Sequence, residues 1–150
     1  IQVVICGTGQ LENFFKSNHY ENIVYAGFIN LQQYAHLCKI SDYGLAPFLT
    51  RKDLSMSIPN KIGEYLSGGL GIISSGKNEV KRLLSSSERF NDFDISNKID
   101  CERFLFSLTK KVVADRLKRN KSYQLYDELF NAEKNYKNLS EYLIRYKPKL

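Results

Sequence analysis

The chain has 150 residues, of which 43% are hydrophobic and 13% aromatic, so it is long enough to bury the core of one ordinary domain. It has a net charge of +6 and lacks the run of about 18 apolar residues that would predict a membrane-spanning helix. Its three cysteines, Cys6, Cys38 and Cys101, are odd in number and widely spaced. This predicts reduced core thiols of a cytoplasmic protein rather than a disulfide framework.

The positive charge is unevenly distributed. Residues 1 to 100 contain ten basic and ten acidic residues, whereas residues 101 to 150 contain twelve basic and six acidic ones. A solvated helix face or contact with an anionic membrane surface explains such an excess, and we expect no nucleic-acid partner. The predicted location is the cytoplasm, with peripheral binding at the inner face of the membrane as the alternative role of the basic third.

Strand and helix patterns alternate through the first 85 residues. Continuous apolar runs predict strands at Ile1–Cys6, Asn22–Ala26, Tyr43–Ala46 and Gly71–Ser74. Helical spacing predicts helices at Leu11–Phe15, Leu31–Lys39, Pro59–Ser67 and, approximately, Asn78–Leu84. Repeated β-α units with apolar strands predict an α/β fold, a Rossmann-like doubly wound parallel sheet with helices on both faces.

The remaining residues predict a helical C-terminal part. Ser85–Asp100 is polar and aperiodic, which predicts a loop with at most one short strand near Phe93. From Cys101 the spacing is helical, and a final helix capped by Ser122 carries leucine and aromatic residues as far as Tyr146. We expect these helices to complete the domain.

The turn Gly7-Thr8-Gly9 follows the first predicted strand. Ligands of parallel α/β sheets bind beyond the carboxyl ends of the strands, where this turn lies. Glu12 stands at the position of the third glycine of the dinucleotide-binding fingerprint, so that fingerprint is incomplete. The turn is therefore either purely structural or a place where the backbone approaches a phosphate or a sugar.

The segment around Pro59 is the most informative part of the chain. Pro59 suits the first turn of a helix, where a missing N–H costs nothing, and Gly68 with Gly69 ends that helix before the next strand. Free N–H groups at the helix start and the cation of Lys61 suit a diphosphate, while Glu64 suits the two ribose hydroxyls. The structural alternative is an exposed ion pair between Lys61 and Glu64.

No metal site is predicted from the sequence. His19 and His36 are isolated, without a second histidine or a carboxylate at ligand spacing. The chain also lacks a Walker loop, a nucleophile elbow and a paired-cysteine motif.

Four segments, in this order, resemble the C-terminal, nucleotide-sugar-binding half of a GT-B glycosyltransferase, closest to the large family 4 group of retaining enzymes. The segments are Val3–Gln10, Ile23–Ile29, Leu31–Pro47 and Pro59–Gly69, and the resemblance covers about residues 1 to 147. The last segment is the most specific, because it resembles the donor-site helix that begins Pro-Asn-Lys and continues through Glu-Tyr-Leu.

The resemblance implies transfer of a hexose from a nucleoside-diphosphate sugar to a glycan or lipid-linked acceptor, in bacterial surface polysaccharide or glycolipid assembly. Glu64 would hold the ribose, Lys61 with nearby amides the diphosphate, and Phe28 the base. The residues implied in donor binding are Gly7, Thr8, Gly9, Gly27, Phe28, Ile58, Asn60, Lys61 and Glu64. No metal or other cofactor is implied, because a helix dipole and cations neutralise the departing diphosphate.

Two departures from the family pattern affect the expected activity. Met56 stands where many members carry the first Glu of a paired-Glu motif, and the family's first strand, with its Arg and Lys phosphate ligands, would precede Ile1. We expect residues 1–150 to be a single donor-binding domain without its first β-α unit and without the N-terminal acceptor domain, its partner in the intact enzyme. The isolated chain is then expected to be inactive, and no catalytic residue is assigned.

Two other functions are compatible with the sequence. A nucleotide-sugar 2-epimerase with the GT-B fold would share the donor site, although more acid and base residues than Glu64 are expected for that reaction. A non-catalytic, doubly wound binding module is the second alternative. A phosphoacceptor domain of that kind needs an exposed Asp at a strand end, and the predicted strand ends supply none.

Overall fold

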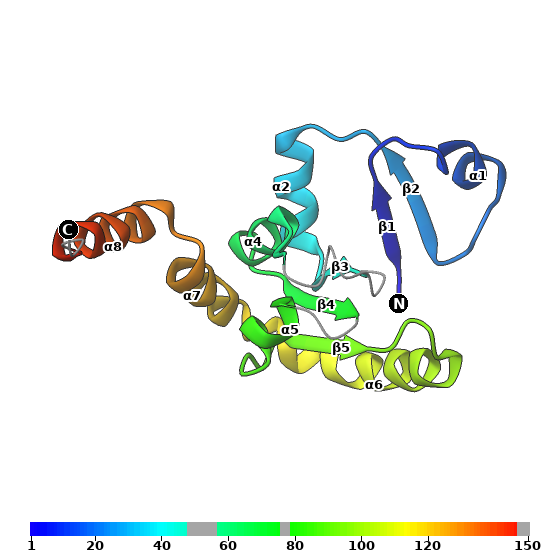
Figure 1. The fold of residues 1–150 in the computed structure, drawn as a ribbon. Helices are drawn as coiled ribbons and strands as arrows, with labels where there is room; N and C mark the ends of the chain where they lie inside the picture. The colour runs from blue at the N-terminus through cyan, green and yellow to red at the C-terminus, as the bar shows by residue number, and fades with distance from the viewer. Residues whose placement is uncertain (48–56, 76–78, 147–150) are drawn as a thin grey trace. The chain divides into compact units, whose positions relative to one another are not determined.

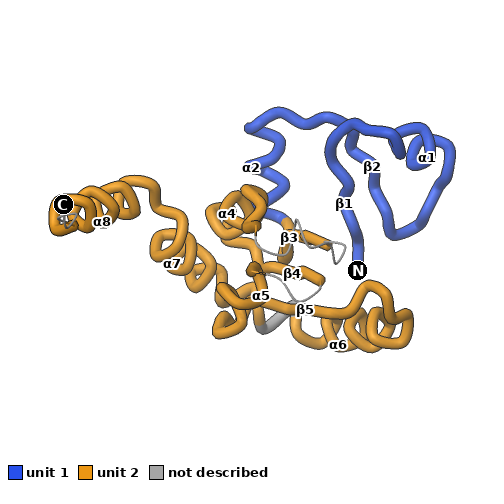
Figure 2. Tube along the Cα trace, in the orientation of Figure 1, with its two compact units in different colours: residues 1–40 blue, residues 41–150 orange. Residues whose placement is uncertain are grey.

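The computed structural model describes residues 1–47, 57–75 and 79–146. Two compact units, Ile1–Ile40 and Ser41–Leu150, are coloured separately in Figure 2. Each unit contains parallel strands together with helices (Figure 1), so the α/β class and the parallel pairing predicted from the alternating pattern are confirmed.

Unit 1 contains two strands and two helices. They are β1 (Val3–Cys6), α1 (Glu12–Ser17), β2 (Ile23–Gly27) and α2 (Leu31–Ile40). β1 and β2 are parallel, with Val3 opposite Ile23, and an irregularity after Ile5 places Cys6 opposite Gly27. Because the strands are parallel, their carboxyl ends lie at the same edge of the sheet.

The two faces of the unit 1 sheet differ in burial. Phe15 of α1 stacks on Tyr25 with 6.0 Å between the ring centroids, so α1 packs on one face. Val4 on β1 is exposed, and so is Cys6, which lies two residues further on and therefore on the same face. The prediction of a buried thiol is wrong for Cys6, because α1 does not cover this face, and it is confirmed for Cys38 of α2.

Unit 2 begins with a three-stranded sheet in the order β3-β4-β5. Its elements are β3 (Tyr43–Ala46), α4 (Asn60–Ser67), β4 (Gly71–Ser75), α5 (Glu79–Leu84) and β5 (Phe90–Phe93). All three strands are parallel, with Gly44 opposite Ile72 and Ala46 opposite Ser74. β4 is the central strand, and all five of its residues are buried. The short strand predicted near Phe93 is confirmed as β5.

The hydrophobic core of unit 2 lies between this sheet and the helices α4 and α5. Its buried members are Ala46, Ile62, Leu66, Ile72, Val80 and Leu84. Each large aliphatic side chain that is fully buried contributes roughly 1.5–3 kcal/mol relative to an exposed one. The core therefore fixes α4 on the sheet, which is the helix that carries the predicted donor-binding residues.

Two glycines determine how α4 packs on β3 and where the helix ends. The ring of Tyr65 occupies the place where a Cβ on Gly44 would stand, so only glycine permits this approach of α4 to β3. Gly69, with φ of +75°, ends the helix in the left-handed region, as predicted for the Gly68-Gly69 pair.

Three helices follow β5: α6 (Lys98–Arg116), α7 (Arg119–Leu129) and α8 (Ala132–Arg145). Figure 1 shows α6 beside β5, where the rings of Phe104 and Phe93 stack with 5.0 Å between their centroids. The prediction of one final helix capped by Ser122 is wrong, because Ser122 is buried inside α7. α7 ends at Leu129, and the following residue, Phe130, packs on Gly63 of α4. A separate helix, α8, begins at Ala132.

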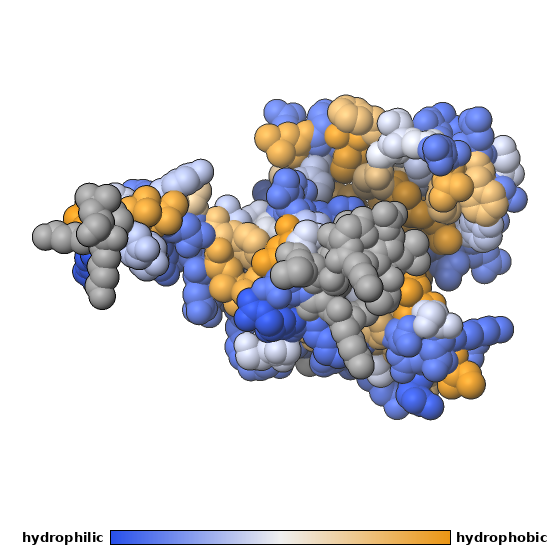
Figure 3. All heavy atoms as spheres, viewed as in Figure 1, coloured by the Kyte–Doolittle hydropathy of each residue, from blue (hydrophilic) through white to orange (hydrophobic). Residues whose placement is uncertain are grey.

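The surface of α8 is partly hydrophobic (Figure 3). Tyr136, Leu139 and Leu143 are exposed and spaced so that they lie on one side of the helix. No residue of α8 is buried. This helix therefore depends on its own hydrogen bonds and caps for stability.

Candidate functional site

The start of α4 is the part of unit 2 where the sequence predicts diphosphate binding. Pro59 has φ of −65° and ψ of 142°, which is extended backbone, so it is the N-cap residue and helical geometry begins at Asn60. This corrects the prediction that Pro59 lies within the first helical turn. Pro59 has no side-chain group that caps the helix, unlike Asn97 and Asn131 at the starts of α6 and α8, although the N–H of Ile62 donates to the carbonyl of Pro59 at 3.0 Å.

The direction of α4 places this start at the carboxyl edge of the sheet. α4 leads through Gly68 into the amino end of β4 at Gly71, so helix and strand run in opposite directions. An eight-residue helix is about 12 Å long and a five-residue strand spans about 13 Å, so the first turn of α4 reaches the level at which β4 ends. That edge is where ligands of parallel α/β sheets bind.

The predicted side chains at the start of α4 are accessible. Asn60, Lys61 and Glu64 are exposed, and Ile58, just before the helix, is 36% exposed. Lys61 and Glu64 form no ion pair with each other in the described part of the chain, so the structural alternative for this pair is absent. Both groups therefore face solvent, one turn apart on the same helix.

Gly7 and Gly27 are brought together at the carboxyl edge of unit 1. Both have positive φ, +116° and +65°, and the N–H of Gly7 donates to the carbonyl of Gly27 at 2.7 Å. The hydroxyl of Tyr25 donates to the carbonyl of Gly7 at 2.7 Å. An L-residue is strained at these φ values, so the close pairing of the two turns requires glycine.

The other predicted residues of unit 1 lie around these turns. Thr8 and Gly9 are exposed, and the carbonyl of Gly9 accepts the N–H of Glu12 at 3.0 Å, which starts α1. The turn thus has a structural role, the first of the two predicted readings. Because Thr8 and Gly9 are exposed, the second reading, approach to a phosphate or sugar, remains sterically open.

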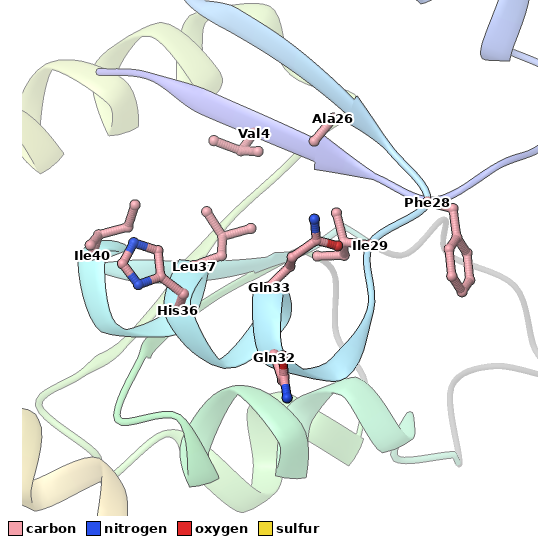
Figure 4. Close-up of a pocket in the computed structure, with 9 residues that line it drawn as sticks. All are labelled: Val4, Ala26, Phe28, Ile29, Gln32, Gln33, His36, Leu37 and Ile40. Atoms are coloured by element: carbon pink, nitrogen blue, oxygen red, sulfur yellow. The ribbon is translucent and has the colours of Figure 1, made fainter.

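A groove of about 480 Å³ runs between β1, β2 and α2 within unit 1. It is lined by Val4, Ala26, Phe28, Ile29, Gln32, Gln33, His36, Leu37 and Ile40. Figure 4 shows Phe28 at one end of it, beyond Ile29, and this residue is 79% exposed. The predicted base-binding residue therefore presents a free aromatic face at the carboxyl edge of β2.

Ser74 of β4 is a candidate that sequence reasoning missed. Its side chain is 1% exposed, and its Oγ has no hydrogen-bond partner among the residues that the structure describes. Ser122 of α7 has the same property. Nothing in the sequence distinguishes such a hydroxyl from the many serines that bond to the nearby backbone, because its isolation depends on the packing around it.

The opposite, amino edge of the unit 2 sheet carries a buried polar network. Arg89, before β5, donates through Nη2 to the carbonyl of Asp42 at 2.9 Å, and Tyr43 donates to Asp115 of α6. Burial raises the pKa of Tyr43, and its bond to Asp115 adds to this rise, while burial lowers the pKa of Arg89. This edge is opposite to the carboxyl edge, where α4 starts. Because the bond from Tyr43 to Asp115 joins β3 to α6, we assign the network to attachment of α6 to the sheet.

Several cations of the basic C-terminal third bind acidic groups of unit 2. Lys118 and Lys121 both bond to Glu88, the former at 2.8 Å, and Arg116 Nε bonds to Asp42 at 2.6 Å. Their charge is therefore partly neutralised within the protein. The positive charge available to a membrane is smaller than the sequence count indicates.

In the described parts of the chain, no three His, Cys, Asp or Glu side chains are grouped as metal ligands. Among the same residues, no helix combines the length and the hydrophobicity needed to cross a membrane. Comparison with protein-family models and with curated protein sequences found no match to this chain.

Proposed function

We propose that this chain is the nucleotide-sugar-binding half of a glycosyltransferase of the GT-B type, similar to family 4. The observation that carries the proposal is the start of α4, where amides without a side-chain cap, the exposed Lys61 and the exposed Glu64 meet at the carboxyl edge of the sheet. Backbone N–H groups and a helix dipole suit phosphate oxygens, and a carboxylate suits vicinal hydroxyls.

The proposed roles follow from these positions. Lys61 and the amides near Ile58 and Asn60 bind the diphosphate, and Glu64 accepts hydrogen bonds from the ribose. In unit 1, Phe28 with Gly27 contacts the base, and the Gly7–Gly9 turn approaches a phosphate. Positive charge and helix amides would neutralise the departing diphosphate without a metal ion.

We also propose that the fold is Rossmann-like and doubly wound, with helices on both faces of its parallel strands. Two observations support this: the named strands that pair within each unit are parallel, and β1 and β2 are rich in apolar residues. Such strands occur almost only in sheets covered on both faces. Hexosyl transfer in bacterial polysaccharide or glycolipid assembly would then need a second domain that binds the acceptor.

A titration of the isotope-labelled chain with UDP, GDP and ADP, followed by NMR in the presence of a chelator, tests donor binding. We expect shifts at residues 7–9, 27–29 and 58–64 with a dissociation constant near 1 mM, about −4 kcal/mol. Glu64→Gln should weaken binding by about 1.5–3 kcal/mol and leave the fold intact. Glu141→Gln, an exposed carboxylate of α8, is the matched control.

Two results would reject this assignment. Shifts confined to other residues would place the site elsewhere, and unchanged binding by Glu64→Gln would leave this carboxylate without the proposed role. The 2-epimerase alternative shares the donor site and is separated by product analysis of the full-length protein, since an epimerase converts the nucleotide sugar without any acceptor. A non-catalytic module would bind the nucleotide and yield no product.

For the basic third we propose peripheral contact with the inner, anionic face of the membrane. The exposed aromatic and leucine residues of α8 support it, since a basic amphipathic helix can lie at such a surface. Sedimentation with anionic and neutral vesicles tests it at low and high salt. We expect binding only to anionic vesicles at low salt, and loss of it in Leu139→Asp; binding to neither kind of vesicle would reject the contact.

A further inference from the structure

Ser74 lies on the face of the unit 2 sheet that α4 covers. Side chains alternate along a strand, so Ser74 shares its face with Ile72, and the register sets it beside Ala46 of β3. Ile72 and Ala46 both belong to the core that contains Ile62 of α4. Ser74 therefore lies between the sheet and this helix.

Ser74 also lies at the level of the first turn of α4. Tyr65 covers Gly44, which stands opposite Ile72. Ala46 and Ser74 lie two residues further along β3 and β4, about 6.6 Å closer to the carboxyl edge than Gly44 and Ile72. One turn back along the antiparallel α4, from Tyr65 to Lys61, covers about 6 Å in the same direction.

Ser74 is 1% exposed, and its hydroxyl has no hydrogen-bond partner in the described part of the chain. A buried hydroxyl without a hydrogen bond destabilises the folded chain, and an alanine at this position would avoid that cost. The amides of the first turn of α4 are likewise without a side-chain cap. An unpartnered hydroxyl and helix amides without a side-chain cap from Pro59 thus lie at the same level, and both kinds of donor suit an anionic acceptor.

We propose that Ser74 Oγ donates a hydrogen bond to a phosphate oxygen of the diphosphate bound at the start of α4. This inference rests on the proposed function. It adds to the phosphate-binding groups a residue that neither the motifs nor the resemblance assigns. The hydroxyl hydrogen turns about the Cβ–Oγ bond, so it can be aimed at an acceptor. Ser74 would join Lys61 and the helix amides in holding the phosphate.

The test compares the parent chain with Ser74→Ala and with the control Ser122→Ala, which removes another buried serine hydroxyl that has no partner within the described ranges. Thermal unfolding without ligand is measured first. We expect both variants to unfold at the parent's temperature or above it, since each loses an unsatisfied polar group. Titrations with UDP and with inorganic pyrophosphate follow. Ser74→Ala should bind both probes at least tenfold more weakly, and Ser122→Ala should bind them like the parent.

The outcomes separate this inference from the function on which it rests. If the parent binds UDP at α4 and Ser74→Ala binds it equally well, the inference fails and the proposed function stands. If the parent binds neither probe, both fail. Weaker binding of UDP with unchanged binding of pyrophosphate would move the contact from phosphate to nucleoside and overturn the inference, as would a Ser74→Ala chain that unfolds at a lower temperature.

Discussion

The contact between Gly44 and Tyr65 is the residue-level detail on which the position of α4 depends. A methyl group on Gly44 would overlap the Tyr65 ring, so Gly44→Ala must displace the ring or the helix. We expect this overpacking to lower the free energy of unfolding by about 2–3 kcal/mol. Gly9→Ala is the control, because nothing lies within 4 Å of its added Cβ. Urea denaturation measures both, and equal effects of the two substitutions would contradict the role of the ring.

Glu88 makes the stability of unit 2 dependent on pH. Hydrogen bonds from Lys118 and Lys121 lower the pKa of Glu88 from 4.5 to about 2. Because the folded-state pKa is depressed, the stabilisation is complete above pH 4.5 and is lost as the pH falls through about 2. Glu88→Gln should therefore unfold at lower urea concentration than the parent at pH 7, and the difference should shrink toward pH 2. A difference that is independent of pH would contradict this origin.

At the residue scale, sequence reasoning identified groups whose chemistry is visible in a motif. Lys61 and Glu64 were predicted from their place after Pro59, and both are exposed on α4. Ser74 could not be predicted, because its isolation follows from the register of β3 and β4 and from the packing of α4. The exposure of Cys6 was missed for a similar reason, since it depends on which face α1 covers.

The caps of α6 and α8 allow the contribution of a single element to be measured. Asn97 and Asn131 accept hydrogen bonds from the N–H groups of Asp100 and Lys134 at 3.2 and 3.1 Å. Replacing either by alanine removes a cap worth about 1 kcal/mol. α6 packs through Leu108, whereas no α8 residue is buried, so Asn97→Ala should lower the global stability and Asn131→Ala should only fray α8.

Urea denaturation reports the global effect of these cap variants, and amide exchange in α8 reports the local one. An Asn131→Ala chain with reduced global stability would show that α8 unfolds together with the rest of unit 2.

Element types were predictable where local periodicity was strong. The strand β3 coincides with its predicted limits, and β2, β4 and α2 differ from theirs by one or two residues. The division between α7 and α8 was missed, although Asn131, a residue type favoured at the N-cap, caps α8 by accepting the N–H of Lys134. The sequence predicted β5 only weakly, because Asn91 and Asp92 interrupt its apolar residues. The pairing of β5 with β4 stabilises this strand.

At the scale of the whole molecule, burial differs strongly between the two units. All five residues of β4 are buried, whereas in residues 1–40 the only residue in the buried class is Cys38. Local stability follows buried apolar contact, so we expect the amides of β4 to exchange with solvent most slowly and those of β1 and β2 to exchange through local opening. Native-state hydrogen exchange measured by NMR tests this. Equal protection of β1 and β4 would show instead that both units unfold in one cooperative step. In the proposed function Phe28 and the Gly7–Gly9 turn of unit 1 contact the nucleotide, so saturating UDP should raise the protection of β1 and β2.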